Sequence, residues 1–219
     1  MADTITTDRP SLFADRDDAF AFVVSGPSGV GKTSICGSVI ENDPRIQHVI
    51  TTTTRGRREG EVDGIDYHFV DQADYQKLLD GDAFLEHATV HGRNYGATKQ
   101  AFLEALADGD VILLEIDVQG AQTLHDVLGD RCVTLFILPP SLEELRARLA
   151  GRRSEGKDAL EIRTQNAIAE MAYAPHYDYV IVNNELSQAI HDVESVVRTE
   201  RNRAQRQTHF FDALNIEHT

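Results

Sequence analysis

The 219-residue sequence has few cysteines, no long apolar run and no ordered set of histidines, and each absence excludes a class of protein. Cys36 and Cys132 are its only cysteines, too few for a disulfide framework, so we expect two small buried side chains in a reducing cytoplasm. No stretch approaches the roughly 20 apolar residues that a membrane-spanning helix needs. The nine histidines are scattered without the spacing of metal ligands. The first 18 residues hold five aspartates and no apolar run, which predicts a flexible acidic tail rather than a secretory signal.

Positive charge is also scarce. The chain has 36 acidic and 21 basic residues, and its formal net charge of −15 disfavours nucleic acid or a membrane surface as a partner. Of the basic residues, 17 are arginines and four are lysines. Arginine makes forked contacts with phosphate, so a cluster of arginines in so acidic a chain indicates an anion site. The composition leaves monomer and homodimer open.

Short apolar runs alternate with helical patterns along the chain. The runs span residues 20–24, 111–116, 133–138 and 179–182. The helical patterns span residues 32–40, 121–128, 141–149 and 187–206, and we expect Ser141 and Ser187 to cap the last two. Strands that alternate with helices predict an α/β fold with a central parallel sheet.

Two segments interrupt this pattern. Residues 47–96 hold closely spaced strand-like pieces joined by polar turns, which predicts an inserted lobe with its own sheet. Residues 150–165 open on a polar, charged stretch with two glycines, which is typical of a mobile lid. The core is then expected to comprise residues 19–46, 97–149 and 166–210.

A glycine-rich octet follows the first expected strand. Its residues fit the pattern G-x-x-x-x-G-K-[ST] and are Gly26, Pro27, Ser28, Gly29, Val30, Gly31, Lys32 and Thr33. Backbone N–H groups and a helix N-terminus at this position favour phosphate, with Lys32 on the β- and γ-phosphates and Thr33 on Mg²⁺. The octet predicts a three-layer P-loop NTPase fold around a nucleotide-binding core. It does not distinguish a kinase from a GTPase or a motor.

A second anion site is indicated further along. Arg55, Arg57 and Arg58 lie in a glycine-bearing loop, where they favour anion binding over a solvated basic patch. Glu86 follows in a strand-like piece, where a lone glutamate is usually on the surface. In a pocket, however, its carboxylate could accept two parallel hydrogen bonds from the N–H and NH₂ on one edge of guanine, a pair that adenine does not offer.

These motifs together resemble the guanylate kinase family over about residues 20–206. The similarity rests on S-G-P-S-G-x-G-K-T, on T-T-R-x-x-R-x-G-E-x-x-G-x-D-Y-x-F, on L-E-x-A followed by Y-G, on L-x-I-D-x-Q-G at Leu114–Gly120 and on Y-D-Y-x-I-x-N at Tyr177–Asn183. The resemblance implies a GMP-binding lobe and a lid around the core. It also implies transfer of the γ-phosphoryl group of ATP to GMP with Mg²⁺, as part of purine nucleotide metabolism.

The resemblance further implies roles by position. The GMP phosphate would be bound by Arg55, Arg58, Tyr67 and Tyr95. Glu86 and Thr51 would read guanine, while Asp117 and Glu115 would serve Mg²⁺ or guanine, with the division between them open. Arginines that close over the transferring phosphoryl group would be Arg152 and Arg163, with Arg148 as a further candidate. Asn183 would lie near adenine. Lys32, Arg58, Arg152 and Arg163 are thus the expected catalytic residues.

Three positions depart from the family pattern. Thr51 replaces a usual Ser, Arg57 replaces a usual Pro, and Ala97 replaces a usual Ser or Thr. The last change removes an expected hydroxyl contact to GMP, which predicts a modestly raised KM.

Three other functions are compatible with parts of this pattern. An inactive guanylate-kinase-like binding module would typically have an eroded P-loop, whereas this octet is complete. A P-loop kinase of a phosphorylated sugar would explain the arginines but not Glu86 with the two tyrosines. A small GTPase would need an N-K-x-D motif, which the sequence lacks.

Overall fold

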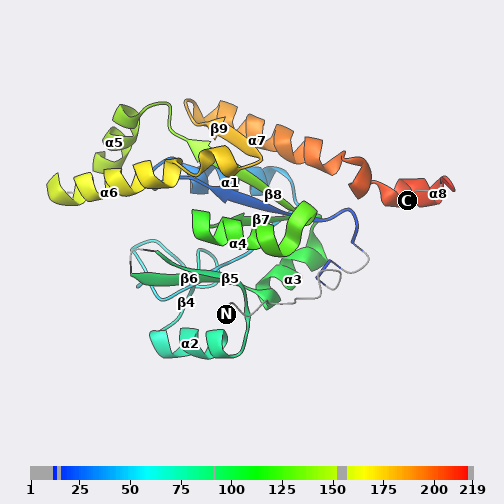
Figure 1. Cartoon of the computed structure of the whole chain (residues 1–219), viewed down its shortest axis with the longest axis horizontal. Coiled ribbons are helices and arrows are strands. Elements are labelled where there is room, and N and C mark those ends of the chain that lie inside the picture. The colour runs from blue at the N-terminus through cyan, green and yellow to red at the C-terminus, as the bar shows by residue number, and fades with distance from the viewer. Residues whose placement is uncertain (1–11, 14–15, 91, 152–156, 217–219) are drawn as a thin grey trace.

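The computed structural model describes residues 12–13, 16–90, 92–151 and 157–216. Its centre is a five-stranded parallel sheet in the order β2-β7-β1-β8-β9 (Figure 1). The strands are β1 (Phe20–Ser25), β2 (Ile46–His48), β7 (Val111–Glu115), β8 (Cys132–Leu138) and β9 (Tyr179–Val182). The four expected strands and their parallel arrangement are confirmed. The expectation for residues 47–48 was wrong, because β2 pairs with β7 in the central sheet and not with the second sheet.

Helices cover both faces of this sheet and make three layers. On one face, α1 (Lys32–Asn42) and α7 (Leu186–Arg201) pack on side chains such as Phe22. On the other face, α3 (Lys99–Asp108) and α4 (Val118–Leu128) pack on side chains such as Val23. The central strands β1, β7 and β8 are mostly apolar, as expected for strands with both faces buried. Both cysteines are buried and free, as expected.

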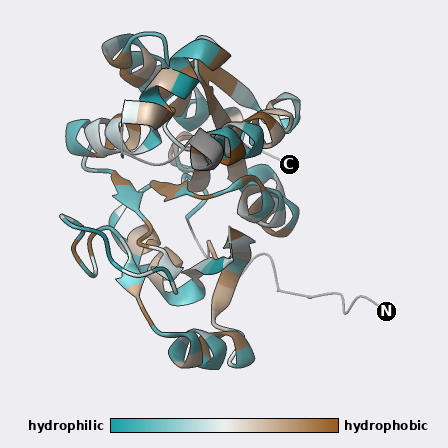
Figure 2. Ribbon diagram, turned by 90° about the vertical axis from the view of Figure 1, so that its left-hand side faces the viewer, coloured by the Kyte–Doolittle hydropathy of each residue, from teal (hydrophilic) through white to brown (hydrophobic). Residues whose placement is uncertain are grey.

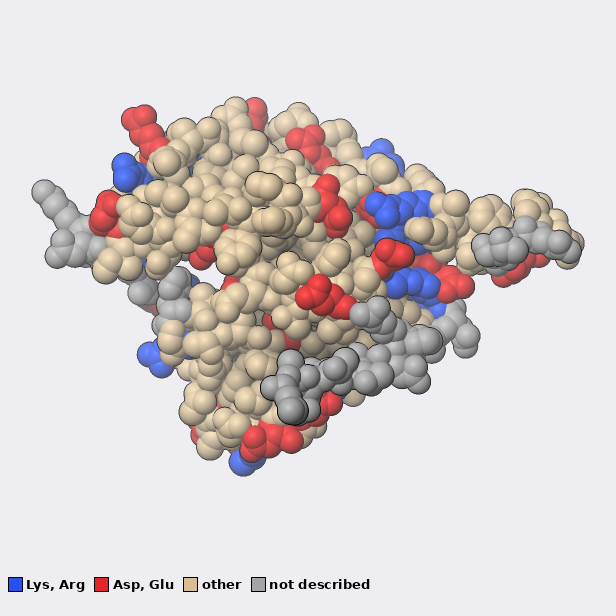
Figure 3. All heavy atoms as spheres, viewed as in Figure 1, with Lys and Arg blue, Asp and Glu red and all other residues tan. Residues whose placement is uncertain are grey.

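Three further helices flank this core. They are α5 (Leu142–Gly151), α6 (Lys157–Met171) and α8 (Thr208–Ala213), and short 3-10 turns span Gly129–Arg131, Ala174–His176 and Ala204–Arg206. Within the described residues, no helix has the length and apolar character needed to cross a membrane. Acidic side chains are spread over the face in Figure 3, whereas basic ones gather in a few places.

A second sheet lies beside α3 and α4, below the central sheet in Figure 1. Its order is β4-β3-β6-β5, and its strands are β3 (Thr52–Thr53), β4 (His68–Phe69), β5 (Phe84–Val90) and β6 (Arg93–Thr98). The helix α2 (Gln72–Asp80) covers its far side. Leu85 and Ala97 bury into the same apolar cluster as α3 and α4, so the second sheet is fixed to the core at its base (Figure 2).

The helix caps confirm one expectation and correct another. Ser141 Oγ accepts a hydrogen bond from the Glu144 N–H at 3.1 Å, as the capping pattern predicted. Ser187 is not the cap of α7. That helix begins one residue earlier, after Glu185, and ends at Arg201 rather than at residue 206.

The expected tail is bound to the core over its described residues, and the described part of the expected lid is helical. Phe13 is buried and meets the Phe102 ring edge-on at 5.6 Å. Arg16 donates to the carbonyl oxygens of Leu106 and Gly109 at 2.8 and 2.7 Å. The expectation of a free tail was therefore wrong for the described residues from 12 to 18, because they bind the core. Residues 157–165 of the expected lid are helical, within α6.

A buried ion cluster closes the carboxyl end of α7. Glu200 is fully buried, and its Oε2 lies 2.6 Å from Arg206 Nη1 and 2.9 Å from Arg203 Nε. Tyr179 donates to Oε1 at 2.5 Å. The Arg206 guanidinium also lies 4.3 Å from the centre of the Phe20 ring, so the turn after α7 is fastened to the first strand.

We expect Glu200→Gln to lower the free energy of unfolding by about 3–5 kcal/mol, because it leaves the buried Arg206 without a counter-charge. Urea denaturation measures the loss. The matched control is Glu194→Gln on the same helix, which is less buried and should change stability by about 0.5 kcal/mol or less. Equal stability of the two variants would contradict a buried charge pair.

Candidate active site

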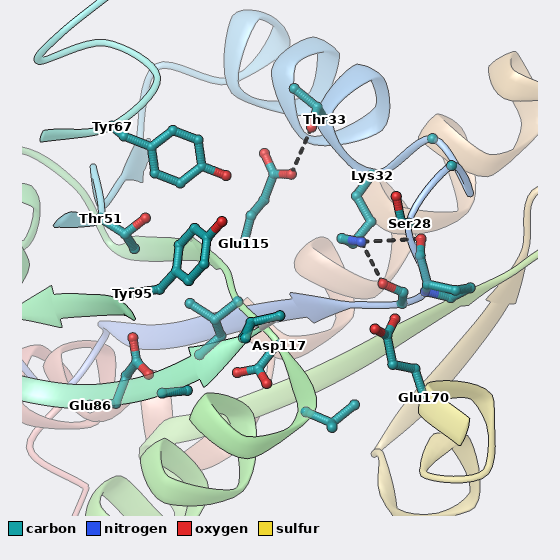
Figure 4. A pocket seen from close by; sticks show the side chains of 18 residues that line it. Ser28, Lys32, Thr33, Thr51, Tyr67, Glu86, Tyr95, Glu115, Asp117 and Glu170 are labelled. Carbon is teal, nitrogen blue, oxygen red and sulfur yellow. Dashed lines mark hydrogen bonds between the residues drawn. The ribbon is translucent and has the colours of Figure 1, made fainter. Parts of the chain in front are cut away.

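A pocket of about 280 Å³ lies at the carboxyl ends of β1 and β7 (Figure 4). The glycine-rich octet forms one side, and Thr51, Tyr67, Glu86 and Tyr95 of the second sheet's lobe form the other. Figure 4 shows Lys32 and Ser28 on the side opposite Glu86 and Thr51. Residues as far apart in the sequence as Gly26 and Glu170 thus line one cavity.

The octet is shaped by glycines that no other residue could replace without strain. Gly26 has φ 149°, and a Cβ there would lie 2.4 Å from the Ile137 carbonyl oxygen on β8. Gly31 has φ 103°, and a Cβ there would lie 2.6 Å from Asn183 Nδ2. That nitrogen donates to the Val30 carbonyl at 2.8 Å, so Asn183 supports the loop from behind. Arg148 and Asn183 also border a second, shallower hollow beside Gly29 and Gly31.

Lys32 and Thr33 lie where the octet meets α1. The Lys32 ammonium donates to the carbonyl oxygens of Gly26 and Pro27, within its own loop. Thr33 Oγ1 donates to Glu115 Oε2 at 3.3 Å, and Figure 4 shows the two side chains pointing toward each other. Burial raises the pKa of Glu115, while Lys32 and the Thr33 hydrogen bond oppose this. This corner therefore holds several oxygen atoms, and the positive charge of Lys32 offsets the negative charge of Glu115.

The oxygen atoms at this corner suit Mg²⁺. That ion prefers oxygen ligands and usually takes one or two from protein, with the rest from phosphate and water. Thr33 and Glu115 supply such a pair. Asp117 also lines the pocket, but it caps α4 by accepting from the Gly120 N–H at 3.1 Å and from Gln119 Nε2 at 2.9 Å. Figure 4 shows Glu115 beside Thr33, whereas Asp117 lies near enough to Glu86 to raise the pKa of its carboxyl group.

The phosphate-binding candidates of the lobe are partly engaged with one another. Arg55 makes a forked pair with Glu61, at 2.9 and 2.7 Å, which raises the pKa of the guanidinium. Its guanidinium carbon lies 5.2 Å from the centre of the Tyr67 ring, and the Tyr67 and Tyr95 rings lie 6.1 Å apart. The side chain of Arg58 is exposed. The structure thus groups Arg55 with the two tyrosines and places Arg58 further out.

Glu86 is 3% exposed at the floor of the pocket. Its Oε1 accepts from the Ala97 N–H at 2.9 Å. Burial raises the pKa of this carboxyl to about 7; the Ala97 N–H opposes the shift and Asp117 adds to it. Thr51 is also buried and lines the same pocket. A buried carboxyl group that is held by one hydrogen bond is suited to selective recognition of hydrogen-bond donors on a ligand.

Of the expected lid arginines, Arg163 reaches the octet. Its Nη2 lies 3.5 Å from Ser28 Oγ, from a position on α6. Arg148 bonds to Glu144 and to the Asn183 carbonyl oxygen. Arg152 lies outside the described residues.

Sequence reasoning missed two carboxylates of this region. Glu170 lines the pocket from α6, seven residues after Arg163 and so on the same helix face. That spacing could have identified it. Glu61 lies in the motif T-T-R-x-x-R-x-G-E, yet the sequence indicated no role for it, because its pairing with Arg55 depends on the fold of the loop.

Comparisons with known proteins agree with this geometry. The model of the guanylate kinase family matches residues 19–200. The chain is 44% identical over 196 residues to a guanylate kinase of Aromatoleum aromaticum, which covers 88% of this chain and 96% of that protein. It is 40% identical over 190 residues to one of Agrobacterium fabrum, covering 87% and 86%. The crystal structure of guanylate kinase from Anaplasma phagocytophilum superposes with a TM-score of 0.74 at 30% identity, covering 91% of this chain and 97% of that one.

Proposed function

Because this chain belongs to the guanylate kinase family, we propose that it transfers the γ-phosphoryl group of ATP to GMP, giving ADP and GDP. The single observation that carries this proposal is the shared pocket, in which a phosphate-binding octet faces a buried carboxyl. ATP phosphates would lie on the octet, with Asn183 and Arg148 toward the adenine side. GMP would lie in the lobe that carries the second sheet, β4-β3-β6-β5. Two buried free thiols fit a reducing cytoplasm as the location.

The GMP side of the pocket would divide recognition between base and phosphate. Glu86 and Thr51 would accept and donate hydrogen bonds at the guanine edge. Tyr67, Tyr95, Arg55 and Arg58 would bind the phosphate. Arg55 is already oriented by Glu61 and by the Tyr67 ring, so little side-chain entropy remains to be lost when phosphate arrives.

The chemistry requires positioning and charge compensation rather than a base. The attacking oxygen belongs to the GMP phosphate, whose second pKa is about 6, so it is already anionic near neutral pH. Lys32 would exchange the Gly26 and Pro27 carbonyls for the β- and γ-phosphates. Mg²⁺ held by Thr33 and Glu115, with Asp117 nearby, would offset charge on the ATP phosphates.

The lid would complete the site. Arg163 already extends to Ser28, and we assign it, together with Arg152, to the transferring phosphoryl group. Residues 150–165 would close over both substrates and exclude water, which would otherwise hydrolyse ATP.

The test is ADP release with ATP and Mg²⁺, compared among GMP, dGMP, AMP, UMP and no acceptor. The proposal expects turnover with GMP far above that with AMP. A protein that binds GMP without turning it over would instead indicate an inactive binding module.

Ala97 offers a test of the contact that the chain lacks relative to its family. Its side chain is fully buried beside Glu86, and the neighbouring Thr98 hydroxyl is occupied as the cap of α3, at 3.1 Å from the Ala101 N–H. We expect Ala97→Ser to lower KM for GMP roughly two- to tenfold, which corresponds to the net free energy of one neutral hydrogen bond, and to leave KM for ATP unchanged. Initial-rate kinetics measure both. Ala105→Ser, in the same apolar cluster but away from the pocket, controls for the burial of a hydroxyl. An unchanged KM for GMP would count against the missing contact.

A further inference from the structure

Gly120 lies directly behind the carboxyl group of Glu86. A Cβ at this position would come within 2.4 Å of Glu86 Oε2 and 3.1 Å of its carboxyl carbon. Real Cβ atoms essentially never show contacts under 3.0 Å, so the end of the Glu86 side chain, or else the helix, would have to shift. Gly120 is the third residue of α4, a buried position where the helix meets β5.

The backbone does not explain a glycine here. Gly120 is not among the glycines with positive φ, which include Gly26, Gly29 and Gly31. Its conformation is helical, and alanine would favour such a helix by about 1 kcal/mol. The close approach of Glu86 is therefore the physical reason for the missing side chain.

The carboxyl group is thus fixed from two sides. Oε1 is held by the Ala97 N–H on β6, and Oε2 rests against the bare backbone of α4. Asp117 accepts from the Gly120 N–H, so the same residue also anchors the second carboxylate of this end of the pocket. A side chain at 120 would push Glu86 toward the space left for a base, or displace α4 together with Asp117.

We propose that Gly120 is a positioning residue for guanine selection, which acts by holding the Glu86 carboxyl group at the floor of the pocket. This inference rests on the proposed function and names a determinant of its base specificity. Gly120 itself offers no side chain to the substrate, and its effect passes through Glu86.

The first variant is Gly120→Ala, assayed with GMP and AMP as acceptors. KM for GMP should rise tenfold or more, and the GMP-over-AMP ratio of kcat/KM should fall by a similar factor. KM for ATP should stay within twofold, because the octet lies across the pocket from Glu86. The matched control is Gly37→Ala, a helical glycine of α1 whose added Cβ would meet nothing within 4 Å, and its kinetics should equal those of the wild type.

The same substitution in a Glu86→Ala background separates positioning from general damage. With the carboxyl group gone, the added Cβ of Gly120→Ala would meet only the end of the Ile116 side chain, at 3.3 Å, which needs to shift by only a few tenths of an ångström. The substitution should then change KM for GMP by less than twofold and the melting temperature by about a degree or two. An equal effect in both backgrounds, on kinetics or on folding, would overturn the inference. So would a wild-type KM and selectivity in the single variant.

GMP binding by calorimetry distinguishes failure of this inference from failure of the proposed function. Wild-type turnover of GMP together with unchanged GMP binding by Gly120→Ala would overturn the inference alone. Wild-type protein that binds GMP without turnover would overturn the proposed activity, while weaker binding by Gly120→Ala would still support the positioning role. Wild-type protein that neither binds nor phosphorylates GMP would overturn both.

Discussion

Replacement of Lys32 by methionine is expected to lower kcat roughly 10³-fold or more, the scale of losing a preorganised charge at the reacting phosphates. Methionine keeps much of the length of the side chain and removes its charge. The ammonium already lies inside the octet, on the Gly26 and Pro27 carbonyls, so it needs only a short movement to reach phosphate oxygens. Steady-state ADP release with both substrates saturating measures the effect.

Two controls make the Lys32 result specific. GMP binding by calorimetry should be nearly unchanged, because Lys32 lies across the pocket from Glu86 and Thr51 (Figure 4). Lys77→Met removes a lysine from the exposed face of α2 and should leave kcat unchanged. A Lys32→Met protein with kcat within tenfold of the wild type would refute the assignment of Lys32 to the phosphates.

Glu86→Gln is expected to lower kcat/KM for GMP at least 100-fold and to reduce the preference for GMP over AMP. Guanine presents two donors on one edge, and a glutamine amide presents one acceptor and one donor. One guanine donor would then face an NH₂ group in a buried site, which is the kind of mismatch that polar recognition rejects most strongly. Competition between GMP and AMP as acceptors measures the change. A variant with undiminished preference for GMP would show that base selection lies elsewhere.

The raised pKa of Glu86 adds a pH signature to this variant. The carboxyl group must be ionised to accept both hydrogen bonds, and its pKa in the free protein is about 7. Wild-type kcat/KM for GMP should therefore fall as the pH drops through 7, whereas Glu86→Gln should keep only the titration of GMP itself, near 6. Identical acid limbs for the two proteins would contradict this.

The same shift predicts that the free enzyme is destabilised by its own specificity residue. The folded pKa of about 7 lies above the ordinary value of 4.5, so the stabilising form is the protonated one and is lost as the pH rises from 4.5 to above 7. Glu86→Gln should thus be more stable than the wild type at pH 8, by up to about 3 kcal/mol, and similar to it near pH 4.5. Urea denaturation at the two pH values measures this. A variant less stable than the wild type at pH 8 would contradict it.

The sequence was informative where local pattern and burial coincide. The strands β1, β7 and β8 were predicted because each is an apolar run with both faces largely buried. The edge strand β9 was predicted from its run of aromatic and β-branched residues, although Val180 and Val182 are exposed, and the octet was predicted because its residues fix a loop geometry. The strand β2 was not separated from the lobe, since it is only three residues long and follows a polar turn. Short edge strands depend on pairing with a neighbour, which the sequence does not display.

Charges were the hardest residues to interpret. Glu200, Arg203 and Arg206 fell within the helical pattern expected for residues 187–206, yet the helix ends at Arg201 and the chain folds Arg206 back over Phe20. The roles of Glu61 and Gly120 likewise depend on the side chains that they contact. Glu61 pairs with Arg55 within a loop whose shape no short pattern predicts, and Gly120 on α4 faces Glu86 on β5.

Contacts at the two ends of the chain set the shortest segment that keeps the core intact. The stretch that matches the family model, residues 19–200, leaves out Phe13, which fills a gap beside Phe102, and every arginine that neutralises Glu200. A protein trimmed to those limits would expose an apolar surface at one terminus and leave Glu200 without its arginine partners at the other. The shortest segment that keeps both contacts runs from Phe13 to Arg206, so truncation and tag placement should respect that boundary rather than the limits of similarity.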